Sequence, residues 1–285
     1  MSTNGLIKMA MLAYLKIEMI GMKAKDADAT HGANRHFNAT DSAGDYQKCK
    51  IDKSDLKEVI KHATRARNEH RNFTMPFGNN GYRILPAKRI LEYTQVMSGH
   101  KALFEAAASD VVIDWPNILT RARTRLIGTL FNPGDYPAQS SVGKYFAFNF
   151  DLSPIPEKSH IVLDLEDTIL HELQDDLEVK QKESLERAMA DVWRRLYEPV
   201  KKMAVVLAND QKIFTSMIVN IEEIVNLLPC MNLAGDPQMT MLANEIKQNL
   251  LGHTAGQIKD DDNLKARLAA DALTLAEKMK NFVTQ

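Results

Sequence analysis

The sequence has few cysteines and no long hydrophobic run. Its two cysteines, Cys49 and Cys230, lie far apart and suit neither a disulfide framework nor a set of four metal ligands, so we expect a protein of the reducing cytoplasm. No window approaches the roughly 20 apolar residues of a membrane-spanning helix, which predicts no membrane association. Lys16 and Glu18 interrupt the apolar N-terminal region, so we expect no secretory signal there.

The sequence also lacks the motifs that usually mark an enzyme. It has no glycine-rich phosphate loop ending in Lys and Ser or Thr, no dinucleotide-binding fingerprint and no Gly-x-Ser-x-Gly elbow. His171-Glu172 begins like the helix of a zinc protease, but Gln174 and Asp175 stand where a second histidine is needed. We therefore predict no enzymatic activity, no cofactor and no metal site.

Charges of both signs are present in nearly equal amounts, but they are segregated along the chain. The net charge of −1 argues against a polybasic coat for nucleic acid. Residues 64–89 carry six cations against Glu69 alone, which gives +5. Residues 164–191 carry ten acidic and three basic side chains, which gives −7. The positions of these two segments in the fold therefore matter more than the total charge.

The hydrophobic pattern predicts a mainly α fold with a small antiparallel β-sheet (α+β). Alternating polar and apolar residues indicate strands over 14–20 and 145–152, the second with one aromatic face. Residues 75–77 and 82–85 indicate a hairpin, because Gly78-Asn79-Asn80-Gly81 suits a tight turn between them. A further strand is a candidate at 160–163, and 26–47 is expected to be a loop with at most a short helix.

Helical periodicity accounts for most of the remaining chain. We expect Ser54 to cap one helix, Pro86 to begin the next, Trp115-Pro116 to break or kink that helix, and Pro199 to kink the longest one. The predicted helices are 54–71, 86–113, 118–131, 165–209, 214–228, 238–251 and 263–283.

Two of these helices are long enough to dominate the architecture. We expect the acidic helix 165–209 to pair with the one that begins at Pro86 as a long, projecting antiparallel helical hairpin, followed by a C-terminal helical bundle. The predicted parts are an N-terminal α+β region, 1–163, with the basic hairpin junction, and a helical region, 164–285, beginning with the acidic helix. The alternative is one continuous domain that shares the long helices.

The basic residues indicate a candidate nucleic-acid surface. Cations that neutralise phosphates, together with aromatic rings on which bases stack, are what a single-stranded DNA-binding protein requires. The alternative is that these cations pair with acidic groups of this chain or of a neighbouring copy. The aromatic rings would then be unavailable for stacking, because aromatic residues in strands usually lie in the core. The candidate residues are Arg65, Arg67, Arg71, Arg83, Lys88, Arg89, Arg121, Arg123 and Arg125.

Three apolar residues of the acidic helix indicate a protein partner. On a projecting helix Ile169, Leu173 and Leu177 would form an exposed apolar patch, and such patches usually mark interaction sites. We therefore expect a homo-oligomer or a complex with another protein.

Several strings of the sequence resemble a known family. They cover most of the chain: Thr74-Met75-Pro76-Phe77 and Gly81-Tyr82-Arg83-Ile84-Leu85-Pro86, Leu126-Ile127-Gly128-Thr129-Leu130-Phe131-Asn132-Pro133-Gly134-Asp135-Tyr136-Pro137, the segment 146–156, Trp193-Arg194-Arg195-Leu196-Tyr197, and Asn232-Leu233-Ala234-Gly235-Asp236-Pro237. Together they resemble a family of uncharacterised proteins of tailed phages and integrative elements. Phe77 and Asn79-Asn80 depart from the family pattern, which tends to have Trp and an acidic residue there.

Members of that family are often encoded near MoxR-type AAA+ ATPases, proteins with a von Willebrand A-type domain, and replication or recombination genes. The resemblance therefore implies a phage-encoded, non-enzymatic adaptor in DNA replication or recombination, which acts in the host cytoplasm as a homo-oligomer or with an AAA+ ATPase. Direct single-stranded DNA binding and inhibition of a host defence protein are the alternatives.

Overall fold

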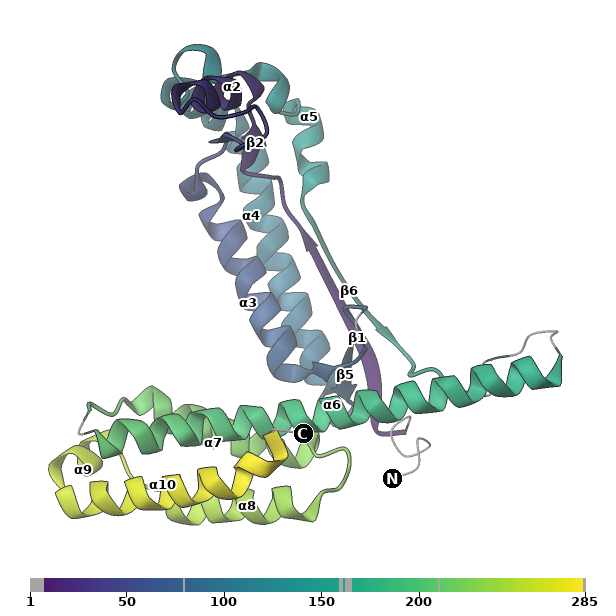
Figure 1. The fold of residues 1–285 in the computed structure, drawn as a ribbon, viewed down its shortest axis with the longest axis vertical. Coiled ribbons are helices and arrows are strands. Elements are labelled where there is room, and N and C mark those ends of the chain that lie inside the picture. The colour runs from purple at the N-terminus through teal and green to yellow at the C-terminus, as the bar shows by residue number, and fades with distance from the viewer. Residues whose placement is uncertain (1–7, 79, 159–160, 162–165, 210, 284–285) are drawn as a thin grey trace. The chain divides into compact units, whose positions relative to one another are not determined.

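The computed structural model describes residues 8–78, 80–158, 161, 166–209 and 211–283 (Figure 1). The predicted fold class is confirmed, because helices predominate and are accompanied by small antiparallel sheets. Among these residues no helix combines the length and apolar composition that crossing a membrane requires.

The chain forms two compact units, each built from separated segments. The bundle unit comprises Met1–Tyr14, Asn72–Leu91 and Leu152–Gln285, and the α3–α4 unit comprises Leu15–Arg71 and Glu92–Asp151. This grouping differs from the predicted division at residue 163, because N-terminal strand segments pack into the same core as the C-terminal helices.

The α3–α4 unit is named after its two main helices, α3 (Lys57–Phe73) and α4 (Ile90–Arg125). Its core joins side chains of both helices with the aromatic face of β6 (Ala147–Ser153), and Phe148 is buried there as the alternation predicted. The smaller elements are β2 (Lys23–Lys25), α2 (Ala27–His36), β3 (Gln47–Cys49) and α5 (Gln139–Val142). The two short strands pair at the borders of the segment 26–47, which was expected to be a loop, and they were not predicted.

Helix α4 runs without interruption through Pro116, so the predicted break is wrong. Proline has no backbone N–H, and the carbonyl group of Val112 consequently loses its usual helical partner. The side chain of Gln139 replaces that partner by donating a hydrogen bond of 3.1 Å from Nε2 to the Val112 oxygen. Trp115 also holds the region, since its Nε1 donates to the Pro137 oxygen at 3.0 Å.

The larger sheet has the strand order β4-β5-β1-β6 and includes the predicted hairpin. Strand β4 (Met75–Pro76) pairs antiparallel with β5 (Arg83–Pro86), and β5 pairs with the start of β1 (Ala10–Glu18) from Ala10↔Pro86 to Ala13↔Arg83. Gly78 and Gly81 have φ angles of 54° and 79°, which glycine adopts readily. Pro86 ends β5, and a short 3₁₀ turn (Ala87–Arg89) separates it from α4.

Five helices make up most of the bundle unit: α6 (Asp167–Ala208), α7 (Thr215–Met231), α8 (Pro237–Asn249), α9 (Ala255–Asp260) and α10 (Asp262–Val283). Helix α6 packs most extensively against α10 and next against α7 (Figure 1). The expected pairing of α6 with the helix that follows Pro86 is therefore wrong, because the buried side chains of α4 belong to the core of the other unit.

Two smaller expectations also changed. The first turn before α3 is capped by Asp52 rather than Ser54, since the Asp52 carboxylate accepts the Ser54 N–H at 2.9 Å. The candidate strand at 160–163 falls almost wholly outside the described residues.

Candidate protein-binding groove

Helix α6 has a covered seam and an open face in its C-terminal half. Residues four or three positions apart lie on one side of a helix, and here that side faces α10 and α7. The covered seam consists of Ala188, Val192, Leu196, Val200, Met203 and Leu207. Val205 lies off this seam, and half of it, 50%, is exposed.

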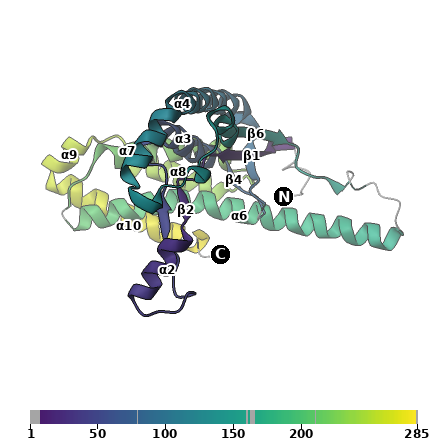
Figure 2. The same cartoon turned by 90° about the horizontal axis from the view of Figure 1, so that it is seen from above.

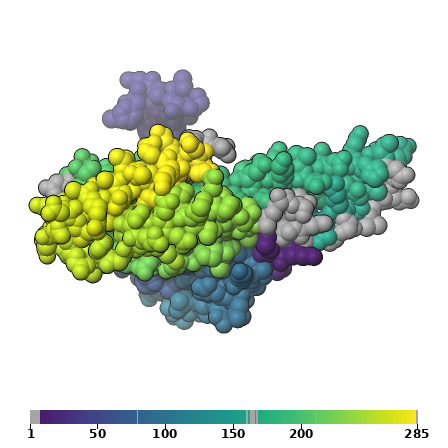
Figure 3. Space-filling model, turned by 90° about the horizontal axis from the view of Figure 1, so that it is seen from below, coloured from purple at the N-terminus to yellow at the C-terminus, as the bar shows by residue number. Residues whose placement is uncertain are grey.

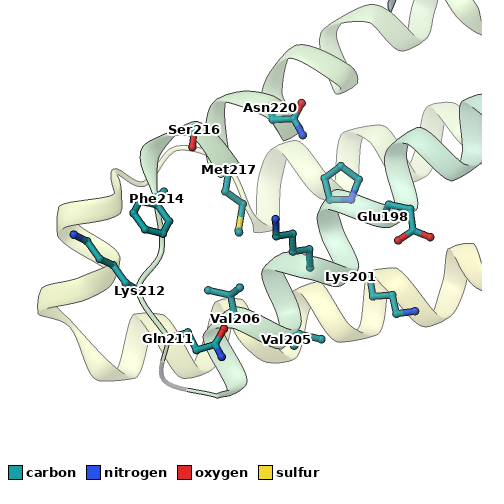
Figure 4. Close-up of a pocket in the computed structure, with 12 residues that line it drawn as sticks. Glu198, Lys201, Val205, Val206, Gln211, Lys212, Phe214, Ser216, Met217 and Asn220 are labelled. Carbon is teal, nitrogen blue, oxygen red and sulfur yellow. The ribbon is translucent and has the colours of Figure 1, made fainter. Parts of the chain in front are cut away.

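A groove of about 890 Å³ lies between the end of α6 and the start of α7 (Figure 4). Its apolar lining consists of Pro199, Val205, Val206, Phe214 and Met217. Val206 is buried, whereas Phe214 is 55% exposed. The groove therefore combines a packed floor with apolar side chains that remain partly in water.

The turn between the two helices holds Phe214 in this position. Helix α6 ends where Asn209 donates its backbone N–H and its Nδ2 to the Val205 oxygen, at 3.1 and 2.9 Å. Ile213 is buried, and the adjacent Phe214 occupies the N-cap position of α7, where its ring has no group that could cap the helix. Phe214 instead lines the groove.

The polar edge of the groove is basic. Lys201, Lys202 and Lys212 stand against Glu198 alone, which gives the lining a net charge of +2. The Nζ atom of Lys212 lies 5.4 Å from the centre of the Phe214 ring, and all three lysines are exposed. None of the three forms an ion pair with another residue of the described chain. Their charge is thus open to an acidic partner.

A second hollow, of about 370 Å³, lies on the other side of the same stretch of α6, towards α10. It shares Lys201 and Val205 with the groove and adds Tyr197, Ala276 and the exposed Leu273. Lys201 and Val205 therefore form a ridge with an apolar hollow on each side.

The N-terminal end of α6 extends beyond the other helices of its unit (Figures 1 and 2), and we define residues 167–182 as this stretch. Figure 3 shows the same teal end of the helix standing clear of α8 and α10. Ile169 and Leu173 are 43% and 40% exposed, as expected, whereas Leu177 is half-buried. We call this stretch the acidic arm.

The acids of the arm point in two directions. Asp175 and Glu178 bind the Nζ atom of Lys158 at 3.1 and 2.6 Å, and hydrogen bonds to Glu178 and then Asp175 raise the lysine pKa. Glu172 and Asp176 instead lie on the face of Ile169 and Leu173, because these four residues are spaced by three or four positions. Both are exposed and have no ion pair among the described residues.

Most of the nine predicted nucleic-acid-binding cations are held by groups of their own unit. Arg121 bonds Asp55 at 2.8 Å and Asp114 at 2.6 Å, and it lowers the pKa of the Asp114 carboxyl group. Arg125 bonds Asp52 at 3.1 Å.

Four further cations contact backbone, hydroxyl or aromatic groups. Arg67 donates to the Ile17 oxygen at 3.0 Å, and Arg83 donates to the Thr74 hydroxyl at 2.7 Å. The guanidinium of the buried Arg89 lies 3.8 Å from the centre of the Phe73 ring, and that of Arg123 lies 5.1 Å from the centre of the Phe131 ring. Each of these four contacts joins groups of a single unit.

Arg65, Arg71 and Lys88 are exposed and have no hydrogen bond or ion pair to other described residues. The first two belong to the α3–α4 unit and Lys88 to the bundle unit. Tyr93, an aromatic residue of the same unit as Arg65 and Arg71, is fully buried, and its hydroxyl forms a hydrogen bond with Nδ1 of His70 at 2.9 Å.

Comparison with known proteins identified no relative: no family model, curated protein or solved structure matches this chain. Within the described part of the chain, no three His, Cys, Asp or Glu side chains gather in a way that could hold a metal ion. The groove residues were not singled out from the sequence. Two local features could have indicated them: Val205 falls outside the apolar seam of its helix, and Phe214 stands two residues after Lys212 in a short helix connection.

Proposed function

We propose that this chain acts by binding and has no catalytic activity of its own. In this proposal the groove between α6 and α7 holds an amphipathic, acidic helix of a partner protein. The observation that carries it is the open apolar groove edged by Lys201, Lys202 and Lys212. Grooves of this kind bind helices through apolar residues on one face, and complementary charge adds specificity and speeds association.

The exposed apolar side chains at the edge of the groove favour binding of an apolar partner. Val205 and Phe214 leave half or more of their surface in water, and covering such surface stabilises a complex by about 25 cal/mol per Å² before the costs of association. The family resemblance adds a partner class to this proposal: an AAA+ ATPase of phage DNA replication or recombination, with this chain as its adaptor.

The direct test is binding of a labelled helical peptide of unrelated sequence, with leucines on one face and acidic residues beside them, measured by fluorescence anisotropy. A second peptide of identical composition, with its leucines scattered around the helix, serves as the probe control. We expect the amphipathic peptide alone to bind, and more weakly as salt rises, because rim charges are screened.

The variant K201E/K202E should weaken binding by about tenfold or more, since it reverses the charge of the groove edge. The matched control is K247E/K259E, which makes the same charge change at two exposed lysines of α8 and α9 outside the groove. Equal binding by both double variants, equal binding of both peptides, or no binding at all would contradict the proposal.

A salt titration with single-stranded DNA tests the alternative activity. Contacts with phosphates require a steep fall of affinity with salt. Binding of that kind, lost in a variant with Arg65, Arg71 and Lys88 replaced by Gln and retained in K201E/K202E, would move the function to the other cations.

A further inference from the structure

We infer that the occupant of the groove is the acidic arm of a second copy of this chain, so that copies bind head to tail. This inference rests on the proposed function, because it names the helix that the groove binds. Two surfaces of one chain carry it: a basic, apolar groove and an acidic, apolar helix face.

The two surfaces match in chemistry. The arm presents Ile169 and Leu173 one turn apart, with Glu172 and Asp176 beside them on the same face. The groove presents Val205 and Phe214, with the lysines at its edge. Docking would cover apolar surface on both sides and place two unpaired carboxylates near three cations that have no ion pair among the described residues.

The two surfaces cannot meet within one chain. The arm and one wall of the groove both belong to α6, which is a continuous helix of 42 residues. The 28 positions from Leu173 to Lys201 correspond to about 42 Å along the helix axis. Because a continuous helix does not fold back on itself, the arm can reach only the groove of another copy.

The contact joins two different surfaces, so it is not symmetric. Each copy has one arm and one groove. A chain of copies therefore always has one free arm at one end and one free groove at the other. Contacts of this type generate closed rings when the rotation between copies closes, and open filaments when it does not. The arm would gain from the contact too, since a helix with little tertiary packing is only marginally stable in water.

The test is a complementation experiment on the full chain, followed by sedimentation velocity over a wide range of protein concentration. The wild-type protein should increase in mass with concentration, and added salt should oppose the increase. V205D alters the groove and the adjoining hollow but not the arm, and L173D alters only the arm; both positions are exposed. Each variant alone should stay monomeric.

A mixture of V205D and L173D should form a complex of two chains and stop there. The intact arm of the first variant fits the intact groove of the second, while the two altered surfaces carry aspartates that repel each other. M241D, at an exposed apolar residue of α8, is the matched control and should assemble like the wild type. K201E/K202E is a second groove variant that should replace V205D in the mixture with the same result.

The outcomes separate this inference from the proposed function. A wild-type chain that stays monomeric but binds the unrelated peptide overturns the head-to-tail contact and leaves the groove as a helix-binding site. A chain that assembles while the mixed variants do not complement also overturns it, since another surface must then join the copies. A monomeric chain that binds no peptide overturns both proposals.

Discussion

The two halves of α6 show the same apolar periodicity but have opposite environments. In the C-terminal half, Leu196 and Val200 are almost completely buried against other helices of the bundle unit. In the N-terminal half, Ile169 and Leu173 continue the pattern and remain exposed. An apolar stripe on a helix is stable when another surface buries it. In α6 the chain's own helices bury only the C-terminal half of the stripe.

The point of change lies near Gln181 and Ser184, which are buried polar residues on the same stripe. Gln181 donates its amide to the Pro156 oxygen, and the Ser184 hydroxyl bonds the Lys180 oxygen at 2.7 Å. Both polar groups are therefore satisfied. They separate the half of α6 that serves the core from the half that we propose serves a partner.

The largest difference in stability should appear when one leucine in each half of α6 is truncated. L196A removes a side chain that is only 1% exposed, and we expect it to lower the free energy of unfolding by about 2 to 5 kcal/mol. L173A, the same change in the arm, should cost less than about 0.5 kcal/mol at low protein concentration. Urea unfolding, followed by circular dichroism, measures both. Similar losses would show that the arm is part of the core.

An intermediate effect is expected at the link between α6 and β4. Arg195 donates to the Thr74 oxygen at 2.7 Å and bonds Asp191 at 2.7 Å. R195A should cost about 1 to 3 kcal/mol, because hydrogen bonds from charged groups are among the stronger ones. The neighbouring Arg194 is exposed and has no hydrogen bond to the described residues, so R194A is the control and should be near neutral. Equal unfolding midpoints for the two variants would contradict this anchoring role.

The smallest effect should appear in the arm when Lys158 is replaced. K158A removes both ion pairs with Asp175 and Glu178, and we expect slightly faster hydrogen exchange over residues 167–182. K182A removes an exposed lysine of the same helix that has no ion pair among the described residues, and it should leave exchange unchanged.

The raised pKa of Lys158 also predicts the direction of a pH effect. A lysine whose folded pKa is raised stabilises the fold below its ordinary pKa of 10.5, and this contribution is lost as the pH rises through the raised value. The wild-type arm should therefore lose helicity at alkaline pH, and K158A should show a smaller change over that range. Titration by circular dichroism compares the two, and identical curves would contradict the prediction.

Elements with strong periodicity were predictable almost to the residue. The helix expected over 165–209 is α6 (Asp167–Ala208), and the one expected over 263–283 is α10 (Asp262–Val283). The hairpin was equally clear, because its two glycines permit the φ angles that the turn requires. In these cases the information lies within a few neighbouring residues.

Predictions failed where a distant residue decided the outcome. Pro116 removes one hydrogen bond from its own helix, and Gln139, which is distant in the sequence, supplies a replacement donor to the Val112 oxygen. The partner of α6 was mispredicted because several helices have suitable apolar faces. Small residues of α10 such as Ala272 and Ala276 permit close packing there, but periodicity alone does not show which helices meet.

The candidate site was predicted in part. Exposure of Ile169 and Leu173 was expected from a projecting helical hairpin whose second helix was wrongly identified, and Leu177 is half-buried. The groove depends on the turn between two helices and was missed. The nine cations gathered from sequence proximity are divided between two units and are mostly held by partners such as Asp52 and Asp114.

By itself, the sequence determined which stretches are helical, where their apolar stripes run and where charges of each sign are concentrated, since backbone propensity and side-chain periodicity act over a few residues. Only the tertiary structure decided which stripes are covered, which cations keep an open charge and that Phe214 and Val205 meet at one groove. Those properties depend on segments far apart in the chain, whose packing is set by the shapes of whole elements.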